Sequence, residues 1–308
     1  SKDQVDTQGW EETRKQPVGS GPWRWVDNIV WQSTVGERVP FEHPYRDVQL
    51  QRVEQYNVPL AETGITALRT GALDAHYAQL QPEQATDLVE RGFNVVAKAS
   101  PHAIGVHYQV MDACDNGWPT CDKKVRQALE YAVDRQGIAD NIWGGFVVPQ
   151  TQPGLPGFPG FNYDIPATPY DPDLTEKLLD EAGYPRGDDG WRFEGDYWVW
   201  ETGSIQQTAE AVCANLNTVG VKCNFNKVEI GVYLRMHNRT DGYEWVMFGQ
   251  LRSSRQRSID TFAHSERGKC IECYSNPEYD VLRLKIVAEP DPEARNAMIQ
   301  RAMEIWVE

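Results

Sequence analysis

The residue types that most often carry catalysis or hold metals are present, but they form no recognisable constellation. No two of the six histidines have the four-residue spacing that places two imidazoles on one helix face; they are His43, His76, His102, His107, His237 and His264. The sequence has no Gly-x-Ser-x-Gly, His-Glu-x-x-His, Walker or dinucleotide-binding motif. Acidic residues are numerous, but abundance alone does not indicate a catalytic pair. The sequence therefore predicts no catalytic residue, no metal site and no cofactor.

The six cysteines form three pairs that are close in sequence: Cys114 with Cys121, Cys213 with Cys223, and Cys270 with Cys273. An even number in such pairs indicates disulfide bonds and an oxidising compartment. The second pair is expected to join the end of a helix to the following strand. For the third pair a redox or zinc site stays open as an alternative. A small-loop disulfide is favoured there, because the loop is polar and no second ligand pair has suitable spacing.

Tryptophan is abundant, with eleven copies and a dense group at Trp191, Trp198 and Trp200. Trp198 and Trp200 share one face of the expected strand, because strand side chains alternate with period two. One interpretation is a stacking platform for a sugar or for an apolar part of a ligand. The other is that both rings belong to the core. Trp200 is the better ligand candidate, since it leads directly into the loop at residues 201–204.

Composition restricts the partners. The chain has 308 residues, long enough for two domains, and a net charge of −15. Nucleic acid is not an expected partner, because phosphate binding needs a basic surface. There is no apolar run of about 18 residues that could span a membrane. The chain begins Ser1, Lys2, Asp3 without an apolar leader, so we expect that a secretory signal or a longer upstream piece has been removed.

The clearest element is a helix predicted over residues 125–136. Its apolar positions follow the spacing of one buried helix face, namely Val125, Ala128, Leu129, Ala132 and Val133. Arg126, Glu130 and Asp134 are expected on the opposite side.

A Pro- and Gly-rich loop over residues 149–169 is expected to lead into a second helix. Asp171 is its candidate N-cap, Pro172 occupies the first helical position, and Gly183 ends it.

Elsewhere short strands and helices alternate, which predicts an α/β fold. Strands are expected at 23–28, 29–38, 48–56, 73–78, 93–97, 107–111, 191–200, 221–228 and 243–248. Helices are expected at 62–70, 82–92, 205–219 and 230–238, followed by two that begin at Pro277 and Pro292. Residues 1–16 are predicted to be a polar helix or tail, and an arginine-bearing loop is predicted to follow residue 248.

Four blocks in this order resemble the family 5 extracellular solute-binding proteins, the oligopeptide- and dipeptide-binding-type receptors of ABC importers. They are PVGSGPWRW (17–25), ALRTGALDA (67–75), VRQALEYAVDRQGIADNIWGG (125–145) and YDPDLTEKLLDEAGYP (170–185). The resemblance implies an α/β, two-lobed, type II periplasmic-binding-protein-like architecture with mixed sheets flanked by helices. Residues 1–105 would form part of the first lobe, and 106–308 the ligand-facing lobe. Because the family usually has further segments before the first block and after the last helices, we expect an internal portion of a receptor.

The family also suggests where the ligand lies. In peptide-binding relatives a Gly-Trp-x-x-Asp segment supplies the carboxylate that pairs with the peptide's α-ammonium. Here Gly249 is kept, Gln250 stands for the Trp and Ser253 for the Asp. A buried ammonium without a counter-charge is costly, so the resemblance argues against free-amine peptides.

Two replacements for that carboxylate are open. Arg252 beside Ser253 could hold a carboxylate or phosphate, or Gln250 together with Trp200 could hold a sugar. For Arg255 and Arg257 a solvated basic loop is an equal alternative.

The ligand contacts expected from the resemblance and the strand pattern are His107, Gln109, Trp200, Thr202, Gln206, Gln250 and Arg252. The alternative for His107 and Gln109 is a satisfied strand pair near the hinge between the lobes.

The sequence thus predicts a monomeric, non-catalytic receptor, periplasmic or extracellular, that delivers a small hydrophilic ligand to an ABC permease. The ligand would be peptide-like, an oligosaccharide or an anion, and a lipid anchor stays open. One alternative is a carbohydrate-active hydrolase with tryptophan-lined subsites and two carboxylates across a cleft. Another is an ancillary subunit that binds a protein.

Overall fold

The computed structural model describes residues 2–15, 19–29, 32–44, 46–58, 60–77, 80–96, 102–108, 110–152, 156–200, 203–229, 231–232, 248–254, 265 and 275–307. The chain divides into two compact units, Ser1–Leu80 and Gln81–Glu308, and each is described by itself. The predicted division into lobes at residue 105 stays a prediction.

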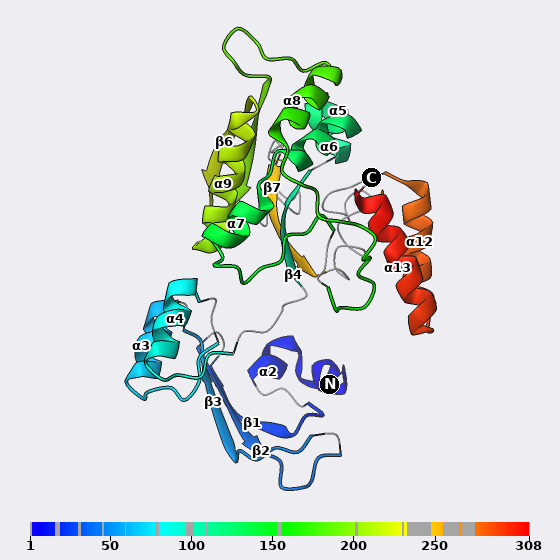
Figure 1. Ribbon diagram of the computed structural model, residues 1–308. Coiled ribbons are helices and arrows are strands. Elements are labelled where there is room, and N and C mark those ends of the chain that lie inside the picture. The colour runs from blue at the N-terminus through cyan, green and yellow to red at the C-terminus, as the bar shows by residue number, and fades with distance from the viewer. Residues whose placement is uncertain are drawn as a thin grey trace. The chain divides into compact units, whose positions relative to one another are not determined.

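The first unit contains a three-stranded antiparallel sheet in the order β1-β2-β3. Its elements are α1 (Lys2–Gln8), α2 (Trp10–Lys15), β1 (Trp23–Ile29), β2 (Ser33–Arg38), β3 (Arg52–Tyr56) and α3 (Ala61–Arg69), as Figure 1 shows. The expected strands at 29–38 and 48–56 are therefore shorter than predicted. Trp25, Ile29 and Tyr56 are 43%, 48% and 52% exposed, so this sheet carries apolar side chains on its surface.

The helix predicted at 62–70 is confirmed, and it stops at Gly71, which has a φ of 73°. The strand predicted at 73–78 is wrong over its described part, 73–77. Instead, the chain turns back and the ring of His76 lies against Gly64 of α3, where a Cβ would be 2.2 Å from His76 Cε1. The strand predicted at 93–97 is also wrong over 93–96, where the chain continues past Gly92 without pairing into a described strand. These two errors have one cause: short apolar runs do not form strands where no neighbouring strand is available to pair with them.

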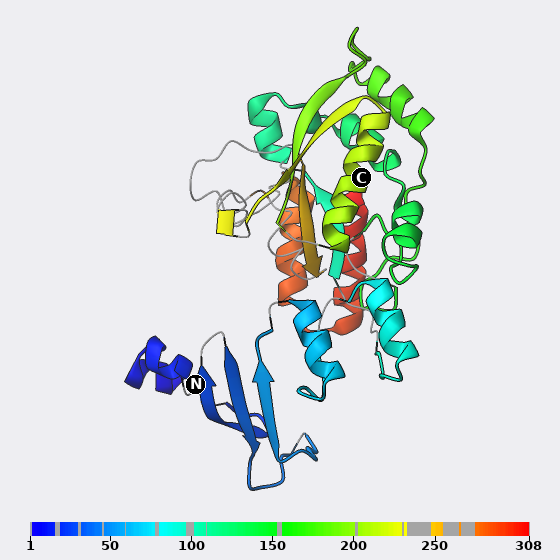
Figure 2. The same cartoon turned by 90° about the vertical axis from the view of Figure 1, so that its left-hand side faces the viewer.

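The second unit is built around a four-stranded mixed sheet in the order β4-β7-β5-β6. Its strands are β4 (His102–His107), β5 (Phe193–Val199), β6 (Val221–Lys227) and β7 (Phe248–Ser254). Its helices are α4 (Pro82–Glu90), α5 (Val110–Asn116), α6 (Lys123–Tyr131), α7 (Arg135–Asn141), α8 (Pro172–Glu181), α9 (Ser204–Thr218), α12 (Pro277–Ala288) and α13 (Pro292–Val307), with a short 3-10 turn at Pro119–Cys121. β5, α9 and β6 form a parallel strand–helix–strand unit, and α9 runs along β6 in Figure 2.

The main core of this unit joins α6, α8 and α9 to β5. All five apolar residues predicted for the buried helix face belong to it, and each is at most 8% exposed. On β5, Tyr197 and Val199 are buried in the same cluster, while Trp198 between them is only partly buried. A second cluster lies between α12 and α13, which run side by side in Figure 1.

The single helix predicted over 125–136 is instead two helices. Asp134 is the N-cap of α7, where its Oδ1 accepts the Gly137 N–H at 2.8 Å. Arg126 donates to the carbonyls of Thr120 and Cys121, both at 2.8 Å, and Glu130 pairs with Arg135. Arg126 and Glu130 lie outside the buried face of α6, as predicted, but Asp134 does not continue that side, because an Asp followed by a helix-compatible turn starts a new helix as readily as it continues the old one.

Two further predictions around β4 and β7 need correction. The strand predicted at 107–111 lies earlier, and the chain becomes helical at Val110, so His107 ends the strand instead of beginning it. The arginine-bearing loop predicted after residue 248 begins as strand β7. In both cases pairing with a distant strand decided the structure, which local alternation does not reveal. The helix predicted at 230–238 falls mostly outside the described residues.

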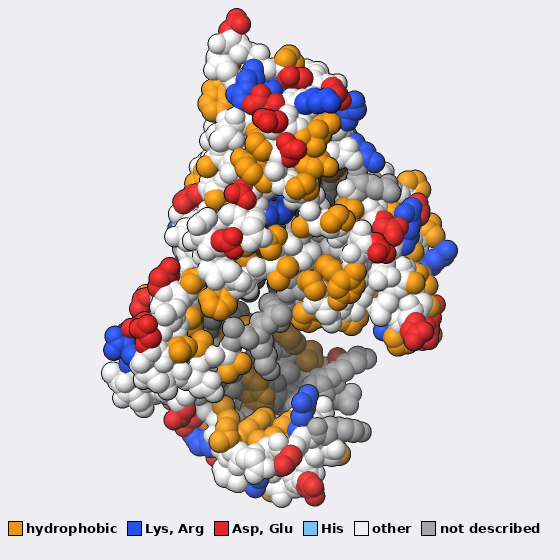
Figure 3. Space-filling model, in the orientation of Figure 1, with side chains coloured by type: hydrophobic (Ala, Val, Ile, Leu, Met, Phe, Trp, Pro, Cys, Tyr) orange, Lys and Arg blue, Asp and Glu red, His pale blue; other side chains and the backbone are white. Residues whose placement is uncertain are grey.

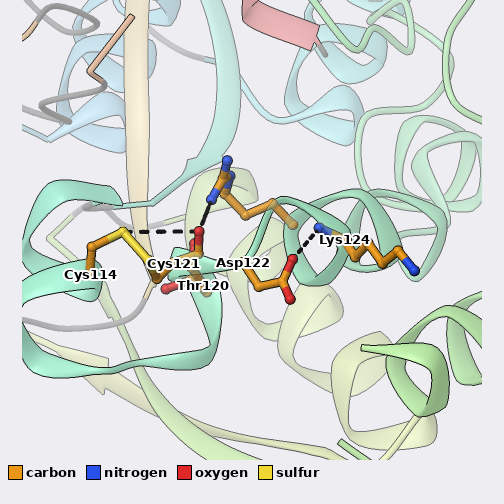
Figure 4. The surroundings of a disulfide bond; sticks show 6 residues. Cys114, Thr120, Cys121, Asp122 and Lys124 are labelled. Carbon is orange, nitrogen blue, oxygen red and sulfur yellow. Dashed lines mark hydrogen bonds between the residues drawn. A yellow bond between two sulfur atoms is a disulfide. The ribbon is translucent and has the colours of Figure 1, made fainter. Parts of the chain in front are cut away.

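Two disulfides are confirmed. Cys213 of α9 is bonded to Cys223 of β6, with 5.2 Å between their Cα atoms. Cys114 is bonded to Cys121, and this small loop is held against α6 by the hydrogen bonds of Arg126 (Figure 4). Cys270 and Cys273 lie outside the described residues.

A buried arginine fastens the end of α8 to the sheet. The side chain of Arg192 is 2% exposed and donates to the carbonyls of Tyr184 (2.6 Å) and Val219 (3.0 Å). It also pairs with Glu176 at 3.2 Å and with Asp180. Acidic and basic side chains are interspersed over α8 and over the α12–α13 pair in Figure 3.

Candidate ligand-binding site

The second sheet has a feature that commonly marks binding sites in α/β proteins. β5 has a parallel neighbour on each side, β6 and β7, and the chain leaves β5 through α9 to β6 on one side before reaching β7 on the other. Such a switch in direction opens a crevice at the carboxyl end of the strand where the connections diverge. The carboxyl end of β5 is therefore the position at which this fold favours a ligand.

The strand register places three of the predicted contact residues near this end. His107 pairs with Gly249, and Gly249 pairs with Trp198, so these three positions form one row across the sheet. Gln250 is opposite Val106, one residue further along β7, and Arg252 is opposite Ile104. β7 runs parallel to β5, and the two strands pair at Phe248 with Tyr197 and at Gly249 with Trp198. The later residues of β7 therefore extend towards and past the carboxyl end of β5.

The turn after β5 supplies the other candidates. Trp200 is partly buried directly after the strand, and Gly203 begins α9 with a φ of 64°. The Gln206 amide is held by two neighbours: Oε1 accepts from Lys227 Nζ at 2.8 Å, and Nε2 donates to Glu210 at 2.7 Å. Since Lys227 is the last residue of β6, Gln206 links the start of α9 to the carboxyl end of that strand.

Gln109 and Thr202 lie outside the described residues. For His107, Gln250 and Arg252 the structure describes the strand position alone. The role of all seven residues as ligand contacts stays a prediction, as does the choice between stacking platform and core for the tryptophans. Trp198 Nε1 is buried and has no hydrogen-bond partner among the described residues.

Two tyrosines near the candidate site are kept neutral by the core. Burial raises the pKa of Tyr108, which follows β4, and the nearby charge of Glu130 raises it further. Burial also raises the pKa of Tyr197 on β5. Both phenols therefore stay protonated at ordinary pH.

One residue that contacts this turn could not be predicted from the sequence. Gln81, at the start of α4, accepts a hydrogen bond from Ser204 Oγ at the start of α9. The two residues are 123 positions apart, and neither belongs to a motif, so only the fold brings them together.

Within the described part of the chain, no group of three or more His, Cys, Asp or Glu residues could hold a metal ion. None of the helices that the structure describes is long and apolar enough to cross a membrane.

Residues 2–265 match the model of the bacterial extracellular solute-binding proteins, family 5 Middle. The chain belongs to this family. The prediction made from the four sequence blocks is thereby confirmed. The family consists of solute-binding proteins, which gives the hydrolase alternative no support.

Individual relatives agree with this assignment. Heme-binding protein A of Haemophilus influenzae is 30% identical over 228 residues, which cover 70% of this chain and 38% of that protein. The glutathione-binding protein GsiB of Pectobacterium atrosepticum is 28% identical over 229 residues, which cover 73% of this chain and 42% of that protein. The chain thus spans well under half the length of these two relatives.

Solved structures confirm the fold class. The periplasmic binding protein DppA from Helicobacter pylori, in complex with the peptide STSA, matches with a TM-score of 0.76 at 21% identity, over 100% of this chain and 60% of that one. NikZ from Campylobacter jejuni, in complex with Ni(L-His), matches with a TM-score of 0.80 at 19% identity, over 98% of this chain and 62% of that one. The α/β architecture of type II periplasmic-binding proteins is therefore established for this chain.

Proposed function

We propose that this chain is the ligand-binding part of an extracytoplasmic receptor that captures a small hydrophilic molecule and delivers it to an ABC permease. Family membership over residues 2–265 supports the receptor class. The strand order supports a position for the ligand. It lies at the carboxyl end of β5, where the sheet reverses its winding direction between β6 and β7. The receptor would act as a monomer outside the cytoplasm, with or without a lipid anchor.

The proposed mechanism is closure of two lobes around the ligand. A ligand that contacts both lobes stabilises the closed form over the open form, and so shifts the population without any chemical step. The permease would then recognise the closed form.

For the ligand class, relatives offer heme, glutathione, a peptide and a nickel complex as precedents. This chain has Ser253 where the peptide-binding pattern has Asp. We therefore propose a ligand that does not present a free α-ammonium at that position. An anionic group near Arg252 and a sugar between Trp200 and Gln250 are the two arrangements that the residues suit.

Isothermal titration calorimetry tests this proposal with a free-amine tetrapeptide, Ser-Thr-Ser-Ala, and with its N-acetylated form. The wild type should bind the free-amine form no better than the acetylated form. Ser253→Asp should gain at least about tenfold affinity for the free amine, because close charge pairs across an interface couple by about 1.5 kcal/mol or more, and about 1.4 kcal/mol corresponds to a factor of ten.

Ser254→Asp is the matched control, since it adds the same charge one residue further along β7. Equal gains in both variants would show a general charge effect. A wild type that already prefers the free amine would contradict the proposed ligand class.

A further inference from the structure

The start of α4 contacts the start of α9 through polar side chains that do not belong to the hydrophobic core. Ser204, which is 3% exposed, donates its hydroxyl hydrogen to Gln81 Oε1. Gly203 allows the close approach: a Cβ there would lie 2.7 Å from Gln81 Nε2. Pro82, the next residue, lies close to the turn after α7, since a Cβ on Gly144 would be 3.1 Å from Pro82 Cβ.

The side chain of Gln81 serves two helices at once. At the start of α4 the Gln81 side chain accepts from the backbone N–H of Gln84, and the backbone N–H of Gln81 donates to Gln84 Oε1 at 2.8 Å; together these bonds form a capping box. Towards α9 it accepts from Ser204. The Ser204 carbonyl accepts from Thr208 Oγ1 at 2.7 Å, and Thr208 Oγ1 accepts in turn from Trp143 Nε1 at 2.9 Å. A continuous chain of hydrogen bonds therefore runs from α4 into the first turn of α9.

Gln81 also stands at a junction of the chain. It is the first residue of the second compact unit and directly follows Leu80, the last residue of the first. Leu88 is the buried residue of α4, and it belongs to neither core cluster of the unit. The polar contact at Gln81 thus lies at the first residue of the second unit. The helix that it begins, α4, buries a single side chain, Leu88.

We propose that Gln81 is a positioning residue for the ligand site: it fixes the start of α9, including Gln206, relative to the start of α4. This inference rests on the proposed receptor function. Ligand contacts made by the start of α9 are then coupled through Gln81 to α4. A merely structural role would instead make Gln81 important only for the stability of α4.

Amide hydrogen exchange separates these two roles without any ligand. The reporter is the amide of Gln207, which donates to the Gly203 carbonyl at 3.0 Å. Gln81→Ala should speed its exchange at least about tenfold, because the start of α9 loses its anchor. Gln84→Ala is the matched control, since it breaks the capping box of α4 and leaves the contact with Ser204 intact.

Gln81→Glu should restore slow exchange, since both bonds that the side chain accepts need only a carboxylate or amide oxygen. The inference is overturned if Gln81→Ala leaves the Gln207 amide unchanged, or if Gln84→Ala accelerates it equally.

A second measurement concerns binding. Stopped-flow tryptophan fluorescence follows dissociation of glutathione, Ser-Thr-Ser-Ala and the nickel–histidine complex from the wild type and from both alanine variants. For any of these that the wild type binds, Gln81→Ala should raise the dissociation rate at least about fivefold and Gln84→Ala should not; equal rates in the two variants would overturn the coupling. If the wild type binds none of them, which is compatible with a ligand that lacks a free α-ammonium, the exchange result alone decides whether Gln81 positions the start of α9.

Discussion

Replacement of Arg192 by alanine tests how the second unit is held together. The side chain is 2% exposed, and its removal leaves the partly buried carbonyls of Val219 and Tyr184 without this donor. Its acidic partners, Glu176 and Asp180, are 40% and 56% exposed, so water can replace the arginine there. Two unsatisfied carbonyls at about 1–3 kcal/mol each, less some relaxation, give an expected loss of about 3 kcal/mol in the free energy of unfolding.

Urea unfolding followed by tryptophan fluorescence measures this loss, and thermal unfolding should show a fall in Tm of about 6–12 °C for a unit of this size. Arg301→Ala is the matched control. Arg301 makes ion pairs with Glu278 and Glu304, but its side chain is 43% exposed, so its removal should cost less than about 1 kcal/mol. If the two variants lose equal stability, or if Arg192→Ala loses less than about 1 kcal/mol, the reasoning from burial is refuted.

Three further outcomes are expected. Cys223→Ser, which removes the bond from β6 to α9, should lower the free energy of unfolding by about 2–3 kcal/mol, measured against wild type under oxidising conditions. Reduction breaks Cys114–Cys121 in both proteins, so the difference between variant and wild type should then disappear; a difference that persists after reduction would show that the bond is not the cause. Hydrogen bonds from Arg186 lower the pKa of Glu176. The contribution of this carboxylate to the free energy of unfolding is therefore present above the unfolded pKa of about 4.3 and is lost as pH falls through the lower folded pKa. Glu176→Gln should flatten the acid limb of a plot of Tm against pH, and an unchanged limb would contradict this linkage. Gly203→Ala should lower the free energy of unfolding by about 1–3 kcal/mol, because Gly203 has a positive φ and Gln81 lies close to it. Gly105→Ala is the control and should cost under about 1 kcal/mol, because a Cβ there meets nothing within 4 Å. Similar Tm values for the two variants would argue against the close approach of Gln81.

The predictable parts of this fold are those in which local periodicity and tertiary packing agree. Val125, Ala128 and Leu129 are buried where the helical spacing places them, and the cap at Asp171 with the stop at Gly183 bounds α8 as expected. Each of these signals acts within a few residues, so the sequence contains it in full.

Other features could not be predicted from local sequence, because they depend on contacts between distant parts of the chain. Residues 249–254 resemble a polar loop in isolation, yet they form a strand because β4 and β5 offer partners. Arg192 has no local feature that distinguishes it from a surface arginine, and its burial depends on carbonyls of two other elements. For the candidate site, family resemblance proposed the residues, whereas the register of β4, β5 and β7 is what relates His107, Gln250 and Trp200 in space.

Native mass spectrometry of the protein purified from its own source, compared with its denatured mass, tests the proposal that this protein binds and releases a small molecule as a receptor. We expect an excess native mass that disappears on denaturation and belongs to a hydrophilic compound without a free α-ammonium. No excess mass, together with no binding of anionic, sugar or peptide ligands by calorimetry, would contradict it.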